Sequence, residues 1–288
     1  MEDQIVESKP DARFALRLCV LASGSAGNCS VLALDSDDGT FFWLIDAGLS
    51  MKRTRRVLAE VGLADRRPNG ILLTHLDNDH ANPSVLDGFG DDVPVFMHRR
   101  HLRRAEREGR LFRRTEMLDD GLRLGQGCTI RVRLAHHDID GSAALRFCFE
   151  RERGCCELGY ATDVGRPTAE LIEHLSGVDV LAIESNYCPK MQEVADRPAI
   201  VKSRVMGGSG HLSNQQCRRM VHAIAPQHHV VLLHLSRQCN TPELAALEHL
   251  GSGYQLSISS QTVPTPWIQA ALRAPGPARV HAETLFEV

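Results

Sequence analysis

Residues 69–80, NGILLTHLDNDH, carry the strongest signal in the sequence. The apolar run ILL predicts a buried strand, and a polar segment follows it directly. That segment places two imidazoles and two carboxylates within six residues: His75, Asp77, Asp79 and His80. Carboxylates held this close repel one another unless cations neutralise them. Because histidine and aspartate are ligands of divalent metals, we predict a metal site at the carboxyl end of this strand.

Three further candidate ligands stand where other predicted strands end. His137, Asp163 and His234 each follow or close an apolar, β-rich run. Several strand ends can direct side chains to one point, so we expect these residues to join the first cluster. His136 is a rival to His137, because neighbours on a strand point to opposite faces.

The segment GGSGHLSNQQ, residues 207–216, predicts a different kind of site. Its glycines lead into a helix whose start is marked by Ser213 and Gln216, at capping-box spacing. Free backbone N–H groups at a helix start form a natural anion site. We therefore predict that His211 lies beside a bound anion, and the alternative is an ordinary loop before a capped helix.

The composition is that of a globular protein and argues against nonspecific nucleic-acid-binding, membrane-spanning and secreted proteins. The chain has 288 residues, 43% of them hydrophobic and 24% charged, with a formal net charge of −3. That charge argues against a protein coated for nonspecific nucleic-acid binding. No apolar run is long enough to span a membrane, and the N-terminus lacks the pattern of a signal peptide. The nine cysteines form no regular framework, so we expect free thiols and a cytoplasmic protein.

Short apolar runs alternate with helical segments along the chain. Strands are predicted at 17–23, 29–35, 41–47, 69–75, 93–98, 129–135, 144–150, 156–162, 178–185, 229–235 and 254–259. Helices are predicted at 51–63, 167–176, 190–205, 214–225 and 242–250. We expect one α/β domain over 14–262 with layered sheets and helices, flanked by extensions at 1–13 and 263–288.

An arginine-rich segment follows the strand at 93–98. At helical spacing Arg99, Arg103, Arg107, Arg110 and Arg114 share one face. This face is a candidate for gripping a nucleic-acid backbone, and a solvated helix surface is the alternative. No aromatic residues stand between these arginines, so base stacking has no support here.

Several segments, taken in order, resemble one known family. HLDNDH is similar to the metallo-β-lactamase signature His-x-His-x-Asp-His, with Asp77 in place of the second histidine. The other segments resemble the WalJ (YycJ) group of that superfamily: LASGSAGN (21–28), LIDAGLS (44–50), TDVG (162–165), ESN (184–186), GHLSN (210–214) and HLS (234–236). The resemblance covers roughly residues 17–260, and it implies a four-layer αββα sandwich.

The resemblance also implies a dinuclear centre and assigns its ligands. His75, Asp77 and His137 would hold one divalent ion, Asp79, His80 and His234 the other, and Asp163 would bridge them. The ions would be Zn²⁺ or Mn²⁺, or Fe²⁺. A hydroxide bridging them would attack phosphorus, with Asp79 and His211 as catalytic residues. The implied substrate-binding residues are Ser25, Asn28, Asn186, Gly210, Ser213 and Ser236.

The implied activity is that of a phosphodiesterase of the exonuclease type, with DNA as substrate and no membrane partner. Two other classes stay open: a metallohydrolase acting on a small ester, thioester or cyclic phosphate, and a catalytically weak metal-binding regulatory protein. Asp77 departs from the family pattern, as do Tyr187 and Cys188 after the ESN segment. Carboxylate oxygen is a harder ligand than imidazole nitrogen, so Asp77 should shift metal preference from Zn²⁺ toward Mn²⁺. Asp46 and Ser236 are candidates for orienting the ligands.

Overall fold

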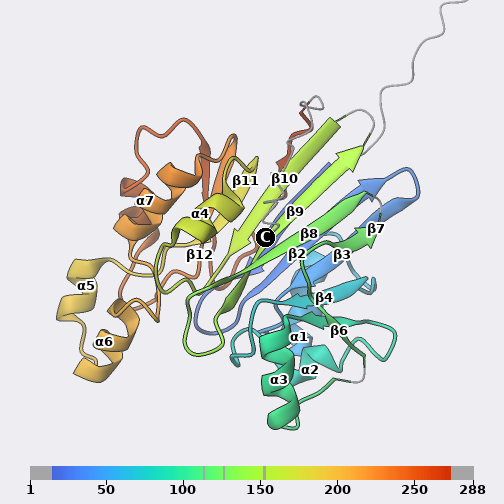
Figure 1. Ribbon diagram of the computed structural model, residues 1–288, viewed down its shortest axis with the longest axis horizontal. Helices are drawn as coiled ribbons and strands as arrows, with labels where there is room; N and C mark the ends of the chain where they lie inside the picture. The colour runs from blue at the N-terminus through green and yellow to red at the C-terminus, as the bar shows by residue number, and fades with distance from the viewer. Residues whose placement is uncertain (1–14, 113, 126, 152–153, 274–288) are drawn as a thin grey trace, which may run out of the picture.

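The apolar runs of the sequence form two mixed sheets of seven strands each in the computed structural model, which describes residues 15–273 except 113, 126 and 152–153 (Figure 1). The first sheet has the order β14 (Ile268–Ala270), β1 (Ala15–Ala22), β2 (Cys29–Ser36), β3 (Gly39–Ile45), β4 (Gly70–Leu73), β5 (Val95–Met97) and β6 (Thr115–Met117). The second has the order β13 (Gln255–Ile258), β12 (His229–Leu233), β11 (Val180–Glu184), β10 (Gly154–Ala161), β9 (Ser142–Arg151), β8 (Cys128–Ala135) and β7 (Leu122–Gly125).

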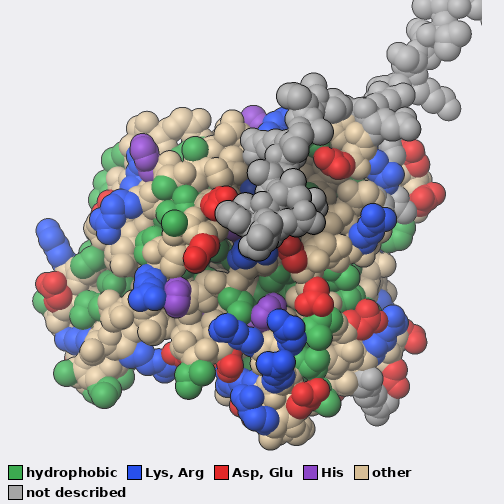
Figure 2. Space-filling view, in the orientation of Figure 1, with side chains coloured by type: hydrophobic (Ala, Val, Ile, Leu, Met, Phe, Trp, Pro, Cys, Tyr) green, Lys and Arg blue, Asp and Glu red, His purple; other side chains and the backbone are tan. Residues whose placement is uncertain are grey.

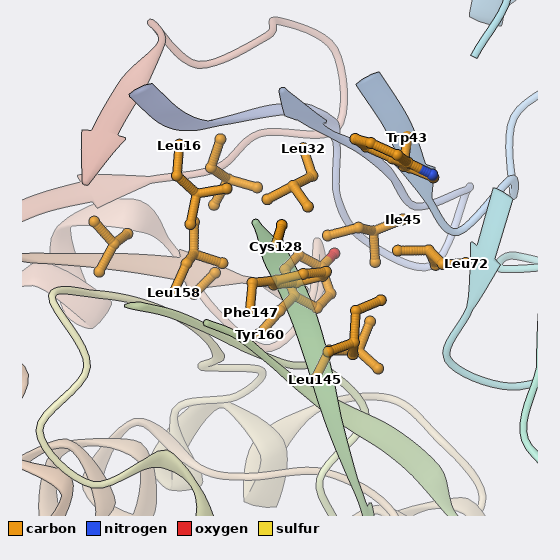
Figure 3. Close-up of a cluster of buried hydrophobic side chains, with 14 of the residues drawn as sticks. Leu16, Leu32, Trp43, Ile45, Leu72, Cys128, Leu145, Phe147, Leu158 and Tyr160 are labelled. Atoms are coloured by element: carbon orange, nitrogen blue, oxygen red, sulfur yellow. The ribbon is translucent and has the colours of Figure 1, made fainter. Parts of the chain in front are cut away.

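The two sheets pack face to face through alternate side chains of their strands. Figure 3 shows Leu16, Leu32 and Ile45 of the first sheet opposite Phe147 and Tyr160 of the second. All five side chains are buried. Since successive strand residues point to opposite faces, the intervening residues are left to face outward.

Helices cover those outward faces, which completes the predicted αββα sandwich. On the first sheet lie α1 (Met51–Glu60), α2 (Pro83–Leu86) and α3 (Arg99–Arg107). The helices after β10 are α4 (Ala169–Leu175), α5 (Pro189–Val194), α6 (Ala199–Met206), α7 (Asn214–Ile224) and α8 (Pro242–Leu247). Of these, α4, α7 and α8 contribute buried residues to the core on the second sheet's outer face, whereas α6 has none.

The start of α7 confirms the predicted capping box. The Ser213 hydroxyl accepts the backbone N–H of Gln216, and the Gln216 side chain accepts the backbone N–H of Ser213. Such reciprocal bonds satisfy two donors that a helix start otherwise leaves without a partner. The first residue of α7 is therefore fixed, and with it the loop that carries His211.

Two predicted helical features are wrong in detail. The segment 190–205 forms two helices rather than one, because Pro198 lacks an N–H and disfavours helical geometry in the residue before it. The arginine face is shorter than predicted, because α3 ends at Arg107. Arg110 and Arg114 consequently lie outside the helix, and Arg114 pairs with Glu116 of β6 at 2.8 Å.

The C-terminal part of the first sheet comes from beyond residue 262. There Thr265 donates its backbone N–H to the Val20 carbonyl, and β14 then pairs with β1. Arg273 next pairs with Cys155 of the second sheet. All nine cysteines are free thiols. Among the helices of the described ranges, none is long and apolar enough to cross a membrane.

Candidate metal centre

The candidate site lies where strands of both sheets end. Asp46 follows β3, His75 to His80 follow β4, Asp163 follows β10 and His234 follows β12. Three of these residues have left-handed backbones, with φ of 60° at Asp46, 52° at Asp163 and 54° at His234. Such conformations cost non-glycine residues about 1–3 kcal/mol each and cluster at functional sites. The strain here turns three polar side chains toward one point.

The first group of candidate ligands consists of His75, His137 and Asp163, whose donor atoms lie within 4.8 Å of one another. Asp77 borders it, because its Oδ2 lies 3.8 Å from the Nε2 atoms of both His75 and His137. His137 is buried, whereas His136 is exposed and its Nε2 lies 3.3 Å from the Arg166 guanidinium. The structure thus brings His137, and not its rival, into the cluster.

The second group consists of Asp79, His80 and His234. Asp79 Oδ2 lies 3.7 Å from His80 Nε2 and 3.7 Å from His234 Nε2. Asp163 joins the two groups, since its Oδ2 lies 3.0 Å from His80 Nε2 and its Oδ1 lies 3.0 Å from His234 Nδ1. All seven residues predicted as ligands therefore converge.

These separations fit divalent ions. Two donor atoms that each lie about 2.1 Å from one ion can be at most about 4.2 Å apart. The nitrogen–oxygen distances of 3.0–3.8 Å from Asp77, Asp79 and Asp163 to the Nε2 atoms of the histidines are below that limit. In addition, His75 Nε2 and His234 Nε2 are buried without a hydrogen-bond partner. Buried polar atoms without partners are costly, and a bound cation would satisfy these.

Neighbouring groups orient the histidine rings. Asp46 is completely buried; its Oδ2 accepts from His80 Nδ1 at 2.7 Å and its Oδ1 accepts the Thr74 N–H at 2.8 Å. The Thr74 hydroxyl lies 3.0 Å from His75 Nδ1, and His137 Nδ1 donates to the Gly210 carbonyl at 3.0 Å. Each of these three rings is held through Nδ1, which leaves its Nε2 toward the centre, as in metal sites generally.

The surroundings of the cluster favour protonation of His137 and His234 but disfavour protonation of His75. Burial lowers the pKa of His234, but the Asp163 charge outweighs it and the pKa rises to about 10. Burial also opposes protonation of His137, yet the neighbouring Asp77 and Asp163 raise its pKa to about 9. Burial together with the charge on His80 lowers the pKa of His75. Although burial raises the pKa of Asp163, the charges of His234 and His80 hold it well below its usual range.

Glu184 is a site residue that the sequence reasoning missed. It is completely buried at the end of β11, where its Oε1 accepts from His211 Nδ1 at 2.7 Å. Its Oε2 accepts the backbone N–H groups of Val164 and Leu212. His211 Nδ1 also lies 3.3 Å from Asp163 Oδ1, so His211 is held against the cluster. The available signal was an acid closing the apolar run VDVLAIES.

The residues predicted to bind substrate lie in different environments. Ser25 is exposed, whereas Asn28 and Asn186 are buried. Asn28 Nδ2 lies 2.9 Å from His80 Nε2 and 3.4 Å from Asp79 Oδ2, so an ion on His80 would take that nitrogen's lone pair away from Asn28. Asn186 donates to the His234 carbonyl at 2.7 Å.

Ser213, Ser236 and Gly210 likewise make bonds within the fold. Ser213 caps α7, and the Ser236 hydroxyl accepts the Cys239 N–H at 3.2 Å. A Cβ on Gly210 would lie 2.5 Å from the Arg204 carbonyl oxygen, so this close backbone approach needs glycine. These bonds shape the site's walls, and direct contact of these residues with a substrate stays a prediction.

The comparisons of this chain with known proteins agree with one another on its family. Residues 43–235 match the beta-lactamase superfamily domain. Exodeoxyribonuclease YycJ of Bacillus anthracis is 26% identical over 235 residues, which cover 81% of this chain and 87% of the relative. Exodeoxyribonuclease WalJ of Streptococcus pneumoniae serotype 2 (strain D39 / NCTC 7466) is 23% identical over 241 residues, with the same coverages.

The fold is also found among solved structures. The metallo-β-lactamase fold protein YhfI from Bacillus subtilis superposes with a TM-score of 0.64 and 15% sequence identity, covering 89% of this chain and 100% of that one. The layered sheets, the cluster of histidines and aspartates at the strand ends and the match over 43–235 agree with one another. This chain therefore belongs to the metallo-β-lactamase superfamily and is a distant relative of the YycJ and WalJ exodeoxyribonucleases.

Proposed function

We propose that this hydrolase is a dinuclear phosphodiesterase that degrades DNA from its ends. The observation that carries the proposal is the pair of ligand groups joined by Asp163, whose oxygens lie 3.0 Å from His80 Nε2 and 3.0 Å from His234 Nδ1. The Oδ2 atoms of Asp77 and Asp79 lie 3.7–3.8 Å from histidine nitrogens of the two groups. Supporting it, the relatives that match most of the chain are named exodeoxyribonucleases. The identity of the metal and the number of ions are part of the proposal.

The ligand assignment follows the two groups. His75, Asp77 and His137 would hold one ion, Asp79, His80 and His234 the second, and Asp163 both. Two divalent ions in such a site supply a nucleophile at neutral pH and neutralise charge on a phosphodiester. The protein's own part is to fix the ligands: Asp46 holds His80 through Nδ1, and the Gly210 carbonyl holds His137 through Nδ1.

His211 is the candidate proton donor to the leaving oxygen. Its Nδ1 is engaged by Glu184 at 2.7 Å, and its side chain is 22% exposed, which is more than that of the buried histidines around it. Burial raises the pKa of Glu184, but the charge of His211 and its hydrogen bond lower it below the ordinary value. Glu184 therefore stays ionised at neutral pH and keeps the Nδ1 proton in place. Nε2 is then the nitrogen left to give a proton to a substrate.

A basic surface adjoins the site on the α3 side. The exposed arginines of this helix include Arg99, Arg103 and Arg107, and Figure 2 shows basic side chains gathered over the α3 region. We propose that they bind DNA phosphates. The logarithm of the DNA-binding constant falls linearly with the logarithm of the salt concentration, and the steepness of this fall is the salt slope. Replacing Arg103 and Arg107 with glutamine should make the salt slope shallower by about 0.9 for each phosphate that the protein no longer neutralises. An unchanged slope would assign these arginines to a solvated surface.

The decisive experiment compares two substrates on protein of measured metal content. End-labelled DNA of defined length and a bis-aryl phosphodiester are each incubated with Zn²⁺- or Mn²⁺-loaded protein. We expect about two metal equivalents per chain, turnover of both substrates and stepwise shortening of the DNA. Aryl phosphodiester turnover without DNA cleavage would favour a small-molecule hydrolase. If neither substrate is turned over although both ions are bound, the protein binds metal without catalysing hydrolysis, and the proposal is wrong.

The His211→Ala variant tests the role of this residue within the same experiment. We expect hydrolysis to slow by about 10²–10⁴-fold, the range for a lost general acid or electrophile, with metal content unchanged. His136→Ala is the matched control, because His136 is a nearby but exposed histidine. A fall in metal content in His211→Ala would make His211 a ligand instead of a proton donor.

A further inference from the structure

Asp77 is the most exposed of the seven candidate ligands. Its side chain is 32% exposed, against 28% for Asp79 and 3% for Asp163. The buried histidines His75, His80 and His137 are held by partners within the sheets or their loops. A partly exposed carboxylate has more rotational freedom than these, so it needs a partner if it is to hold one position.

The partner comes from α3, outside both sheets. Arg104 Nη1 lies 3.5 Å from Asp77 Oδ1. The other oxygen, Oδ2, lies 3.8 Å from the Nε2 atoms of His75 and His137. The two oxygens of Asp77 are thus divided, one toward a guanidinium and one toward the candidate metal position.

Arg104 is itself fixed by two more carboxylates. Its Nε donates to Glu108 Oε1 at 2.8 Å, one helical turn further along the chain. Its Nη1 also lies 3.9 Å from Asp140 Oδ2, in the loop that follows His137. A planar guanidinium can serve several acceptors from one fixed orientation, which a lysine ammonium on a flexible stem cannot. Arg104 therefore joins α3 to the two loops that carry Asp77 and His137.

We propose that Arg104 is a positioning residue of the metal centre, which holds Oδ1 of Asp77 so that Oδ2 alone faces His75 and His137. The inference rests on the proposed role of Asp77 as a ligand. It assigns Arg104 a task separate from that of the exposed arginines of the same helix. Its cation also offsets the extra negative charge that a carboxylate brings compared with a neutral imidazole.

Two physical effects oppose each other when Arg104 is removed. A nearby cation repels a divalent ion, so its loss alone would strengthen metal binding. Loss of a group that orients a ligand weakens metal binding, typically about 10–100-fold. Because Arg104 is 29% exposed and its repulsion is screened by water, we expect the loss of orientation to dominate.

The test measures metal affinity by competition with a chromophoric chelator. In Arg104→Met one of the two sites should bind Zn²⁺ and Mn²⁺ about 10–100-fold more weakly than in the wild type. Arg100→Met is the matched control, since it removes an exposed charge from the same helix. It should leave the affinity essentially unchanged. Affinity in Arg104→Met equal to or above that of the wild type would overturn the proposal.

A double-mutant cycle with Asp77→Ala shows whether Arg104 acts through Asp77. We expect Asp77→Ala to weaken one site, and Arg104→Met to add no further loss in that background. An equal additional loss would mean that Arg104 acts by another route, and the inference would fail. Metal affinity that falls in Asp77→Ala but is unchanged in Arg104→Met would also reject the inference. That result would leave the proposed ligand set unaffected.

The Co²⁺-loaded protein gives a second readout that does not depend on turnover. Its ligand-field absorption reports the donor atoms and their geometry, so it should change in Arg104→Met and not in Arg100→Met. Arg104→Gln serves if the methionine variant does not fold. A spectrum identical to the wild type in the folded variant would mean that Asp77 holds its position unaided. A rise in KM for DNA alone would make Arg104 a substrate-binding residue, against the proposal.

Discussion

Replacing Asp46 with asparagine tests how the site fixes one of its histidines. The Thr74 N–H donates to Oδ1 of Asp46, so the carbonyl oxygen of the new side chain should take that place. The asparagine amide would then donate toward His80 Nδ1. That nitrogen could no longer carry a proton, and the neutral ring would hold its proton on Nε2, the atom that faces Asp163. A protonated Nε2 cannot bind a metal.

The size of the effect follows from the bond that is lost. A buried hydrogen bond to a charged group contributes about 1.5–3 kcal/mol, and the metal-free protein should lose a comparable amount of stability. Metal affinity at the site containing His80 should fall about 10–100-fold. Thermal unfolding in the presence of a chelator measures the first quantity, and chelator competition measures the second.

Asp35→Asn is the matched control for this variant. Asp35 accepts bonds from Arg17 and Thr40 near the end of β2, away from the ligands. It should lose some stability and no metal affinity. If Asp46→Asn binds metal as tightly as the wild type, the argument from the His80 tautomer is wrong.

Three further predictions concern the same centre. A Cβ on Gly48 would lie 1.7 Å from the Asp79 carbonyl oxygen, so Gly48→Ala should displace that loop and lower metal affinity at least about tenfold; Gly253→Ala, with open space around it, should not. Since the pKa of His137 is about 9, this histidine is protonated at neutral pH when no metal is bound; a metal that binds it must displace that proton, and affinity measured by competition should rise as the pH is raised from neutral toward that pKa. A pH-independent affinity would contradict this. Asp77→His should raise the ratio of Zn²⁺ to Mn²⁺ affinity, and an unchanged ratio would remove Asp77 from the ligand set.

The sequence predicted the ligand cluster because the candidate ligands are either close together in the chain or stand where predicted strands end. Four of the seven candidates lie in one loop after β4, and strand ends account for the rest. Alternation along a strand could not choose between His136 and His137, because both stand beyond the last residue of β8. Only the tertiary position, with the Gly210 carbonyl 3.0 Å from His137 Nδ1, decides between them.

Long-range partners were beyond the reach of sequence patterns. Glu184 lies in a run that reads as a buried strand, and its bond to His211 joins β11 to a loop 27 residues away. Helical periodicity placed Arg104 on no functional face, yet it lies beside Asp77. Pairings of this kind depend on how elements pack, which local composition does not encode. The strand at 268–270 was not predicted from the sequence, because it has only three residues and closely follows two prolines.

That short strand has a consequence for the solution behaviour of shortened chains. β14 pairs with the residues of β1 from Leu16 to Leu18, and within the described part of the chain β1 has no other neighbour on that side of the sheet. A chain ending at 262 would leave this apolar strand as an open edge, with unpaired N–H and C=O groups. Open edges recruit strands from other molecules and start aggregation. We expect such a chain to scatter light as it is concentrated, even though its metal ligands are all present.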